Sequence, residues 1–84
     1  MLRKKRIFVG IYSSACDTMA RAEDESGNLI GKASLHDTIN IHVSIKHSWE
    51  TIKNIVSLSL KEAHIQITDP QYEIHVGLGI KNTE

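Results

Sequence analysis

The sequence lacks several features that would point to a special class of protein. It contains one cysteine, Cys16, which excludes an intramolecular disulfide and suits a reducing compartment. No apolar run approaches the roughly 20 residues that a membrane-spanning helix needs. The apolar stretch after the basic start of the chain is interrupted by Gly10, Ser13 and Ser14, which is not the pattern of a signal peptide. We therefore expect a soluble, cytoplasmic protein with no membrane partner.

An excess of charge of either sign is missing as well. Ten Lys and Arg balance ten Asp and Glu, whereas a nucleic-acid-binding domain usually carries a basic excess, so we expect no nucleic-acid partner. The one basic run, residues 3–6, is of the kind that solubilises the end of a strand. A chain of 84 residues is enough for one small domain with a limited core, which favours stabilisation by a partner.

What the sequence does contain is a series of short apolar segments. Residues 5–12 are rich in β-branched and aromatic side chains and predict a first strand that ends in a loop of small polar residues. Alternation over residues 18–24 predicts a second strand, and the Gly-Asn turn within residues 25–28 leads into a third at 29–34. Short connections between consecutive strands predict an antiparallel meander.

The second half of the chain predicts one helix and a last strand. Apolar residues recur there at spacings of three and four, which is typical of one face of an amphipathic helix: Ile45, Trp49, Ile52, Val56, Leu60 and Ala63. On this pattern Trp49 belongs to the core, and Ser44 is the predicted N-cap. The Thr68-Asp69-Pro70 segment implies that the helix has ended before the alternating residues 72–78, which predict a fourth strand. Before the helix, the alternation of Ile39, Ile41 and Val43 suits a short extended piece.

Five segments in sequence order carry a resemblance to a known family. They are Val9-Gly10-Ile11 with its seven-residue loop, the hairpin at residues 23–33, Asn40-Ile41-His42, Ser48-Trp49, and Gly77-Leu78-Gly79. Together they resemble the start of the BadF/BadG/BcrA/BcrD-type ATPases and N-acetylglucosamine kinases, in the actin-like ATPase superfamily. The resemblance implies an α+β, ribonuclease H-like half-domain over residues 1–84, truncated relative to the family. Its sheet order would be 3-2-1-4, with the fourth strand parallel to the first, as a right-handed crossover allows.

The phosphate loop of that family is degenerate in this sequence. Family members run from the first strand into D-G-G-G-T-K-T, whose Asp holds magnesium and whose glycines admit the phosphates of ATP. The corresponding residues here are Tyr12, Ser13, Ser14, Ala15, Cys16, Asp17 and Thr18. A neutral phenol at Tyr12 is a poor magnesium ligand, and Asp17 would repel a phosphate. Only Thr18 matches, so we expect neither ATP nor magnesium as a cofactor and no kinase activity.

Other candidate site residues carry weaker predictions. Asn40 falls at a family position that can contact a sugar, although an Asn in a loop is also a routine turn residue. Cys16 has no neighbouring His and lies beside an acid, so we expect no catalytic thiol. The histidines show no metal-binding spacing and predict no metal site: His36, His42, His47, His64 and His75.

These observations leave three hypotheses. The preferred one is a catalytically inactive remnant of a sugar kinase-like ATPase, a pseudoenzyme that self-associates, most simply as a homodimer, because the central strand is apolar on both sides. The second is a protein-binding or regulatory module with an unknown partner. The third is the nucleotide-binding half of a split kinase completed by another chain, which Tyr12 argues against.

Overall fold

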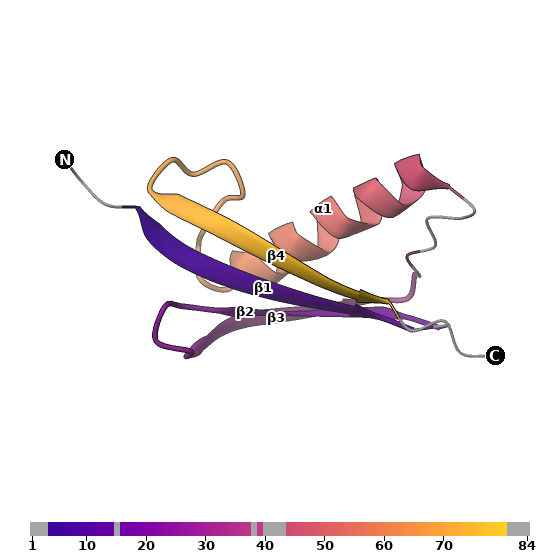
Figure 1. The fold of residues 1–84 in the computed structure, drawn as a ribbon, viewed down its shortest axis with the longest axis horizontal. Coiled ribbons are helices and arrows are strands. Elements are labelled where there is room, and N and C mark those ends of the chain that lie inside the picture. Colours follow the sequence, from indigo (N-terminus) through magenta and orange to yellow (C-terminus); the bar gives the residue numbers. More distant parts are fainter. Residues whose placement is uncertain (1–3, 15, 38, 40–43, 81–84) are drawn as a thin grey trace.

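The computed structural model describes residues 4–14, 16–37, 39 and 44–80. Its elements, in order, are β1 (Lys5–Ser13), β2 (Thr18–Glu23), β3 (Leu29–Leu35), α1 (Ile45–Lys61) and β4 (Tyr72–Ile80). They form one sheet in the order β3-β2-β1-β4, in which β1 is antiparallel to β2 and parallel to β4, with α1 on one side (Figure 1). The predicted fold class, element order and strand order are confirmed.

The β2–β3 turn forms where the sequence predicts it, because its residues meet the needs of a tight reversal. Gly27 adopts a φ of 86°, a backbone conformation that side chains disfavour. The Asp24 carboxylate accepts hydrogen bonds at 2.9 Å from the backbone N–H groups of Ser26 and Asn28. These bonds, with Asn28 foremost, hold the pKa of Asp24 below its usual value.

Helix α1 has capping hydrogen bonds at both ends. The Ser44 hydroxyl accepts a hydrogen bond from the backbone N–H of His47 at 3.1 Å, so the predicted N-cap is confirmed. At the other end His64 has a φ of 58°, and the N–H of Ile65 donates to the carbonyl of Leu60 at 3.2 Å. This left-handed turn ends the helix well before Pro70.

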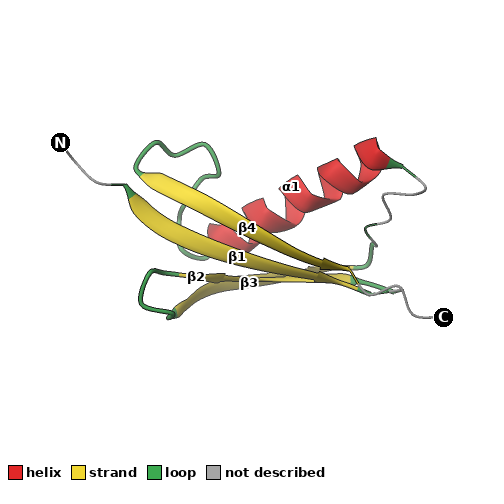
Figure 2. Ribbon diagram, in the orientation of Figure 1, coloured by secondary structure: helices red, strands yellow, loops and turns green. Residues whose placement is uncertain are grey.

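The core lies between α1 and one face of the sheet (Figure 2). Helix α1 covers β3 and β2, reaches β1 less, and leaves β4 outside its cover. Its approach to β3 is so close that a Cβ built on Gly31 would lie 1.9 Å from the backbone oxygen of Ser59. The buried core residues are Ile7, Val9, Ile11, Ala20, Ala22, Ile39, Ile55, Val56, Leu60 and Ile65. Within the described ranges, no helix has both the length and the apolar character needed to cross a membrane.

The predicted apolar stripe of the helix is wrong in its first half. Trp49 is 57% exposed and Ile45 is 75% exposed, whereas the buried residues of this half are Ser48 and Thr51. Close packing and hydrogen bonding explain the difference. The small side chains of Ser48 and Thr51 are buried, and their hydroxyls donate to the Ser44 carbonyl and the Asp37 carboxylate, which an indole could not do. Trp49 is therefore not a core residue, and its ring lies 5.9 Å from the Lys53 ammonium group.

The opposite face of the sheet, here called the open face, has no described element over it. Phe8 and Tyr12 of β1 lie on this face and are 42% and 46% exposed, and Met19 of β2 is 50% exposed. Phe8 stacks on His75 of β4, with ring centroids 5.2 Å apart. The uncovered face expected from the apolar central strand is therefore present, although charged side chains also lie on it.

Candidate functional site

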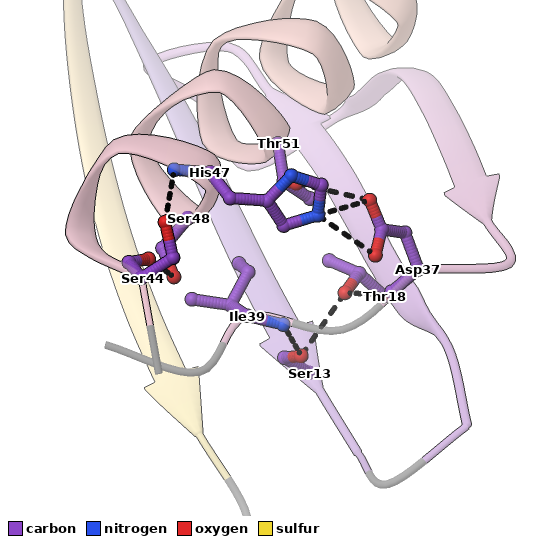
Figure 3. Close-up of polar contacts among 8 residues, drawn as sticks. All are labelled: Ser13, Thr18, Asp37, Ile39, Ser44, His47, Ser48 and Thr51. Atoms are coloured by element: carbon purple, nitrogen blue, oxygen red, sulfur yellow. Dashed lines mark hydrogen bonds and ion pairs between the residues drawn. The ribbon is translucent and has the colours of Figure 1, made fainter. Parts of the chain in front are cut away.

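The resemblance places any phosphate or sugar chemistry at the end of β1, where the chain enters the loop before β2. In the structure a group of polar side chains gathers there, from β1, β2, the segment after β3 and the first turns of α1. We call this group the polar cluster, and Figure 3 shows its members: Ser13, Thr18, Asp37, Ser44, His47, Ser48 and Thr51, with the backbone of Ile39.

A chain of hydrogen bonds runs through the buried part of the polar cluster. The Ile39 N–H donates to the Ser13 hydroxyl at 2.9 Å, the Ser13 and Thr18 hydroxyls lie 3.0 Å apart, and Thr18 donates to the Asp37 carbonyl at 2.7 Å (Figure 3). Because the single Thr18 proton goes to Asp37, the Ser13 hydroxyl must donate to Thr18. Ser13 and Thr18 are 1% and 0% exposed, so both hydroxyls act internally and tie the segment after β3 to β1 and β2.

The outer part of the polar cluster is centred on the Asp37 carboxylate. The His47 Nε2 atom lies 3.2 Å and 3.0 Å from its two oxygens, and the Thr51 hydroxyl donates to Oδ2 at 3.2 Å (Figure 3). Hydroxyl, imidazole and carboxylate are the groups of a catalytic triad. Here, however, the hydroxyl bonds to the carboxylate and not to the imidazole, so the histidine is not placed to activate it. The arrangement fastens α1 to the segment after β3.

The loop between β1 and β2, which corresponds to the phosphate loop in the resemblance, is held closed by hydrogen bonds between its own residues. The Ser14 N–H donates to the Asp17 carbonyl at 2.9 Å, and the Ser14 hydroxyl donates to the Asp17 carboxylate at 3.1 Å. A phosphate loop works by pointing free backbone N–H groups at the ligand. In this loop the first such N–H already has a partner, and a carboxylate lies beside it.

The predicted loop residues are not brought together into one site. Tyr12 lies on the open face opposite Met19, whereas Ser13 and Thr18 are buried on the helix side, and Cys16 is exposed. Ala15 and the predicted sugar contact Asn40 lie outside the described residues. Over the part of the chain that the structure describes, no three His, Cys, Asp or Glu side chains are grouped closely enough to hold a metal ion.

Asp37 is the residue that the sequence analysis missed. Its partners His47 and Thr51 are 10 and 14 residues away, so no local motif points to it. The sequence nevertheless contains a pattern of hydroxyl residues. They recur at spacings typical of one side of a helix: Ser44, Ser48, Thr51 and Ser59. Hydroxyls at helical spacing indicate a close helix contact, which would have argued against an apolar stripe centred on Trp49.

Comparison with known proteins shows the fold and no more. No family model matches the chain, and no curated protein matches it in sequence. Among solved structures, one similar chain is that of a Chromobacterium violaceum protein provisionally assigned as an N-acetylglucosamine kinase, with a TM-score of 0.69 at 17% sequence identity. The match covers 88% of this chain but 26% of the other, so the chain spans about a quarter of that protein.

Proposed function

We propose that this chain is a catalytically inactive domain with a sugar kinase-like fold, which acts by self-association and not by phosphotransfer. The observation that supports catalytic inactivity is the closed loop after β1. Its leading N–H donates to the Asp17 carbonyl, and the Asp17 carboxylate occupies the place where the family has a cation. A nucleotide phosphate would have to break this turn and approach a like charge, both of which oppose binding.

The side chains that flank the loop support the same conclusion. Tyr12 stands where the family places its magnesium-binding carboxylate, and it lies on the open face, away from the buried Ser13 and Thr18. Magnesium takes oxygen ligands in octahedral geometry, mostly carboxylates, phosphates and waters. A neutral phenol cannot replace the carboxylate in that role. The residues present at these positions therefore do not fit a magnesium–nucleotide complex.

The nucleotide half of the proposal is tested by calorimetric titration of the chain with magnesium ATP, alongside an assay of ATP turnover with N-acetylglucosamine. We expect no saturable heat and no turnover. The matched variant Asp17→Lys restores the cation of the family motif; binding by this variant alone would show that the loop charge opposes the nucleotide. Saturable binding by the unaltered chain, or phosphorylation of the sugar, would overturn the proposal.

The association half is supported by the apolar side chains left exposed outside the core. They lie on both faces of the sheet, on the helix and in the segment between α1 and β4: Phe8, Tyr12, Met19, Leu29, Ile45, Trp49, Leu58, Ile67, Val76 and Leu78. Groups of exposed apolar residues on a small domain usually mark an interface. Light scattering of the purified chain should give the mass of a homodimer. A monomer that binds a different protein would instead support the regulatory-module alternative.

A further inference from the structure

The two edges of the sheet differ in how well they are protected from pairing with another strand. At the β3 edge, the Glu62 carboxylate accepts a hydrogen bond from the backbone N–H of Lys32 at 3.3 Å, and the Lys32 side chain is exposed. The β2–β3 register also shifts between Ala22 and Glu23. A charged lysine, an occupied N–H and a register irregularity are the features that natural proteins use to blunt an edge.

The β4 edge has none of these protections. β4 runs for nine residues with the sequence YEIHVGLGI, without lysine, arginine or proline. Its single acid, Glu73, is held toward β1, since one carboxylate oxygen bonds to His75 and lies 3.6 Å from the Arg6 Nε atom. β1 pairs with one side of β4, and no described element lies along the other. A long strand of this kind is a template for strand addition.

We propose that β4 pairs antiparallel with β4 of a second copy, about a twofold axis at Val76, so that the two four-stranded sheets become one continuous sheet. This inference rests on the self-association proposed above and names its surface and register. A twofold axis at Val76 places this residue opposite itself and pairs all nine residues of the strand, from 72 to 80. Moving the axis to His75 or Gly77 would leave the ends of the strand unpaired.

The side chains of β4 are complementary to themselves in this register. On the open face, His75 meets Gly77 of the second copy and Glu73 meets Gly79, so each large side chain lies opposite a residue with none. The stacked pair of Phe8 and His75 is then not crowded, and a large side chain beside a glycine in a neighbouring strand compensates for its missing contacts.

On the helix side the same register joins apolar residues. Val76 meets its own copy and Leu78 meets Ile74, and these positions share a face with Val9, Ile11 and Ile7 through the β1–β4 pairing. Val76 and Leu78 are 46% and 44% exposed in the single chain, because α1 does not extend over β4. Cross-strand pairs of β-branched and aliphatic residues are the units that stabilise antiparallel pairing.

Charge favours a second copy over a strand of arbitrary sequence. The two Glu73 side chains would be separated by six residue steps, about 20 Å along the paired strands, so they do not repel strongly. The Arg6 partner of each Glu73 stays in place because it lies on the β1 side. The antiparallel pair therefore brings together no like charges, which a parallel pair of the same strands would place side by side.

The register is tested by cysteine cross-linking in a Cys16→Ser background. Directly opposite residues in an antiparallel pair have Cα atoms about 4.5–5.5 Å apart, within the span of a disulfide. We expect Val76→Cys to form a covalent dimer under mild oxidation. Leu78→Cys is the matched control, because its two copies would be roughly 14 Å apart along the pair and should not cross-link alone. A mixture of Leu78→Cys and Ile74→Cys chains should cross-link.

A charge variant gives an independent readout. Val76→Lys places two ammonium groups opposite each other and should weaken the dimer at least about 100-fold, while the monomer keeps its fold because Val76 is half exposed. The control Met19→Lys, half exposed on the open face, should leave the dimer constant unchanged. A monomeric unaltered chain would overturn both this inference and the proposed self-association. A dimer that neither cross-links through Val76→Cys nor responds to Val76→Lys would overturn the pairing alone.

Discussion

The β3 side and the β4 side of the sheet differ in how completely they are packed. On the β3 side, α1 lies so close that Gly31 has no room for a side chain, and Glu62 bonds across to the strand. On the β4 side, Val76 and Leu78 lie on the helix-facing surface yet remain nearly half exposed. Among the described elements, one helix thus covers one half of the sheet and none covers the other half.

This difference separates what stabilises the domain from what is available for interaction. The covered side uses small residues and internally satisfied hydroxyls, which permit close contact between α1 and the sheet. The uncovered side has apolar side chains and an unpaired strand, which are the features of an interface. We therefore assign the proposed self-association to the β4 side, whereas the buried hydroxyls that flank the loop after β1 belong to the packed side.

Gly31→Ala should have the largest effect on stability, because the new Cβ would collide with the backbone oxygen of Ser59, which no rotamer change can move. We expect a loss of about 3 kcal/mol in the free energy of unfolding, measured by urea denaturation. The matched control is Gly10→Ala on β1, outside the proposed β4 interface, where a Cβ meets nothing within 4 Å and stability should change by less than about 1 kcal/mol. Equal losses in the two variants would show that the close contact with α1 does not set the cost at Gly31.

Trp49→Ala tests whether the apolar residue in the first half of α1 contributes less to stability than a buried residue in the second half. Because the indole is 57% exposed, we expect a loss of no more than about 1 kcal/mol, including its contact with Lys53. Val56→Ala, at a site that is 1% exposed, should cost about 2 kcal/mol although it removes a smaller side chain. A loss above about 3 kcal/mol for Trp49→Ala, the cost typical of a core tryptophan, would restore the sequence-based assignment of Trp49 to the core.

Ser13→Ala tests the buried hydrogen-bond chain of the polar cluster. The substitution removes the acceptor of the Ile39 N–H and the donor to Thr18, and should cost about 1–3 kcal/mol in thermal or urea unfolding. Ser14→Ala, one residue along, removes a partly buried bond to Asp17 and should cost less. If the two substitutions were equally harmless, Ser13 would not hold the segment after β3 in place.

The smallest effect concerns pH and the β4 side. The hydrogen bond from His75, followed by the charges of His75 and then Arg6, lowers the pKa of Glu73, so the ionised carboxylate stabilises the folded state. This contribution is present above the unfolded-state pKa near 4.5 and is lost as pH falls through the lower, folded-state pKa. Unfolding midpoints followed from neutral to acidic pH should show a slightly weaker acid dependence in Glu73→Gln. Identical pH profiles for the two proteins would mean that the interaction of Glu73 with His75 and Arg6 contributes nothing to stability.

Much of the fold could be predicted from the sequence because its strands are short, alternating and separated by clear turn residues. Strand starts at Thr18 and Leu29 and the N-cap at Ser44 follow from local chemistry alone, and the structure places them there. The assignment of Trp49 failed because periodicity weighs apolar residues and ignores hydroxyls. Ser48 and Thr51 are buried instead. Ser48 bonds back to the Ser44 carbonyl, and Thr51 bonds to Asp37, 14 residues away in the chain.

The candidate site was less predictable than the fold. The loop residues could be recognised as unfavourable for a nucleotide, because the poor affinity of a neutral phenol for magnesium and the negative charge of an aspartate follow from residue type alone. The internal closure of the loop by Ser14 and Asp17 and the sorting of Tyr12 and Ser13 onto opposite faces depend on strand register and backbone geometry, which only the folded structure supplies.

Sedimentation equilibrium of the unaltered chain, without and with magnesium ATP, tests the central claim most directly. The account predicts a mass near twice the 9.4 kDa of the single chain in both conditions, because association uses the β4 side and requires no nucleotide. A mass of 9.4 kDa in both conditions, or a dimer that forms only when nucleotide is present, would contradict it.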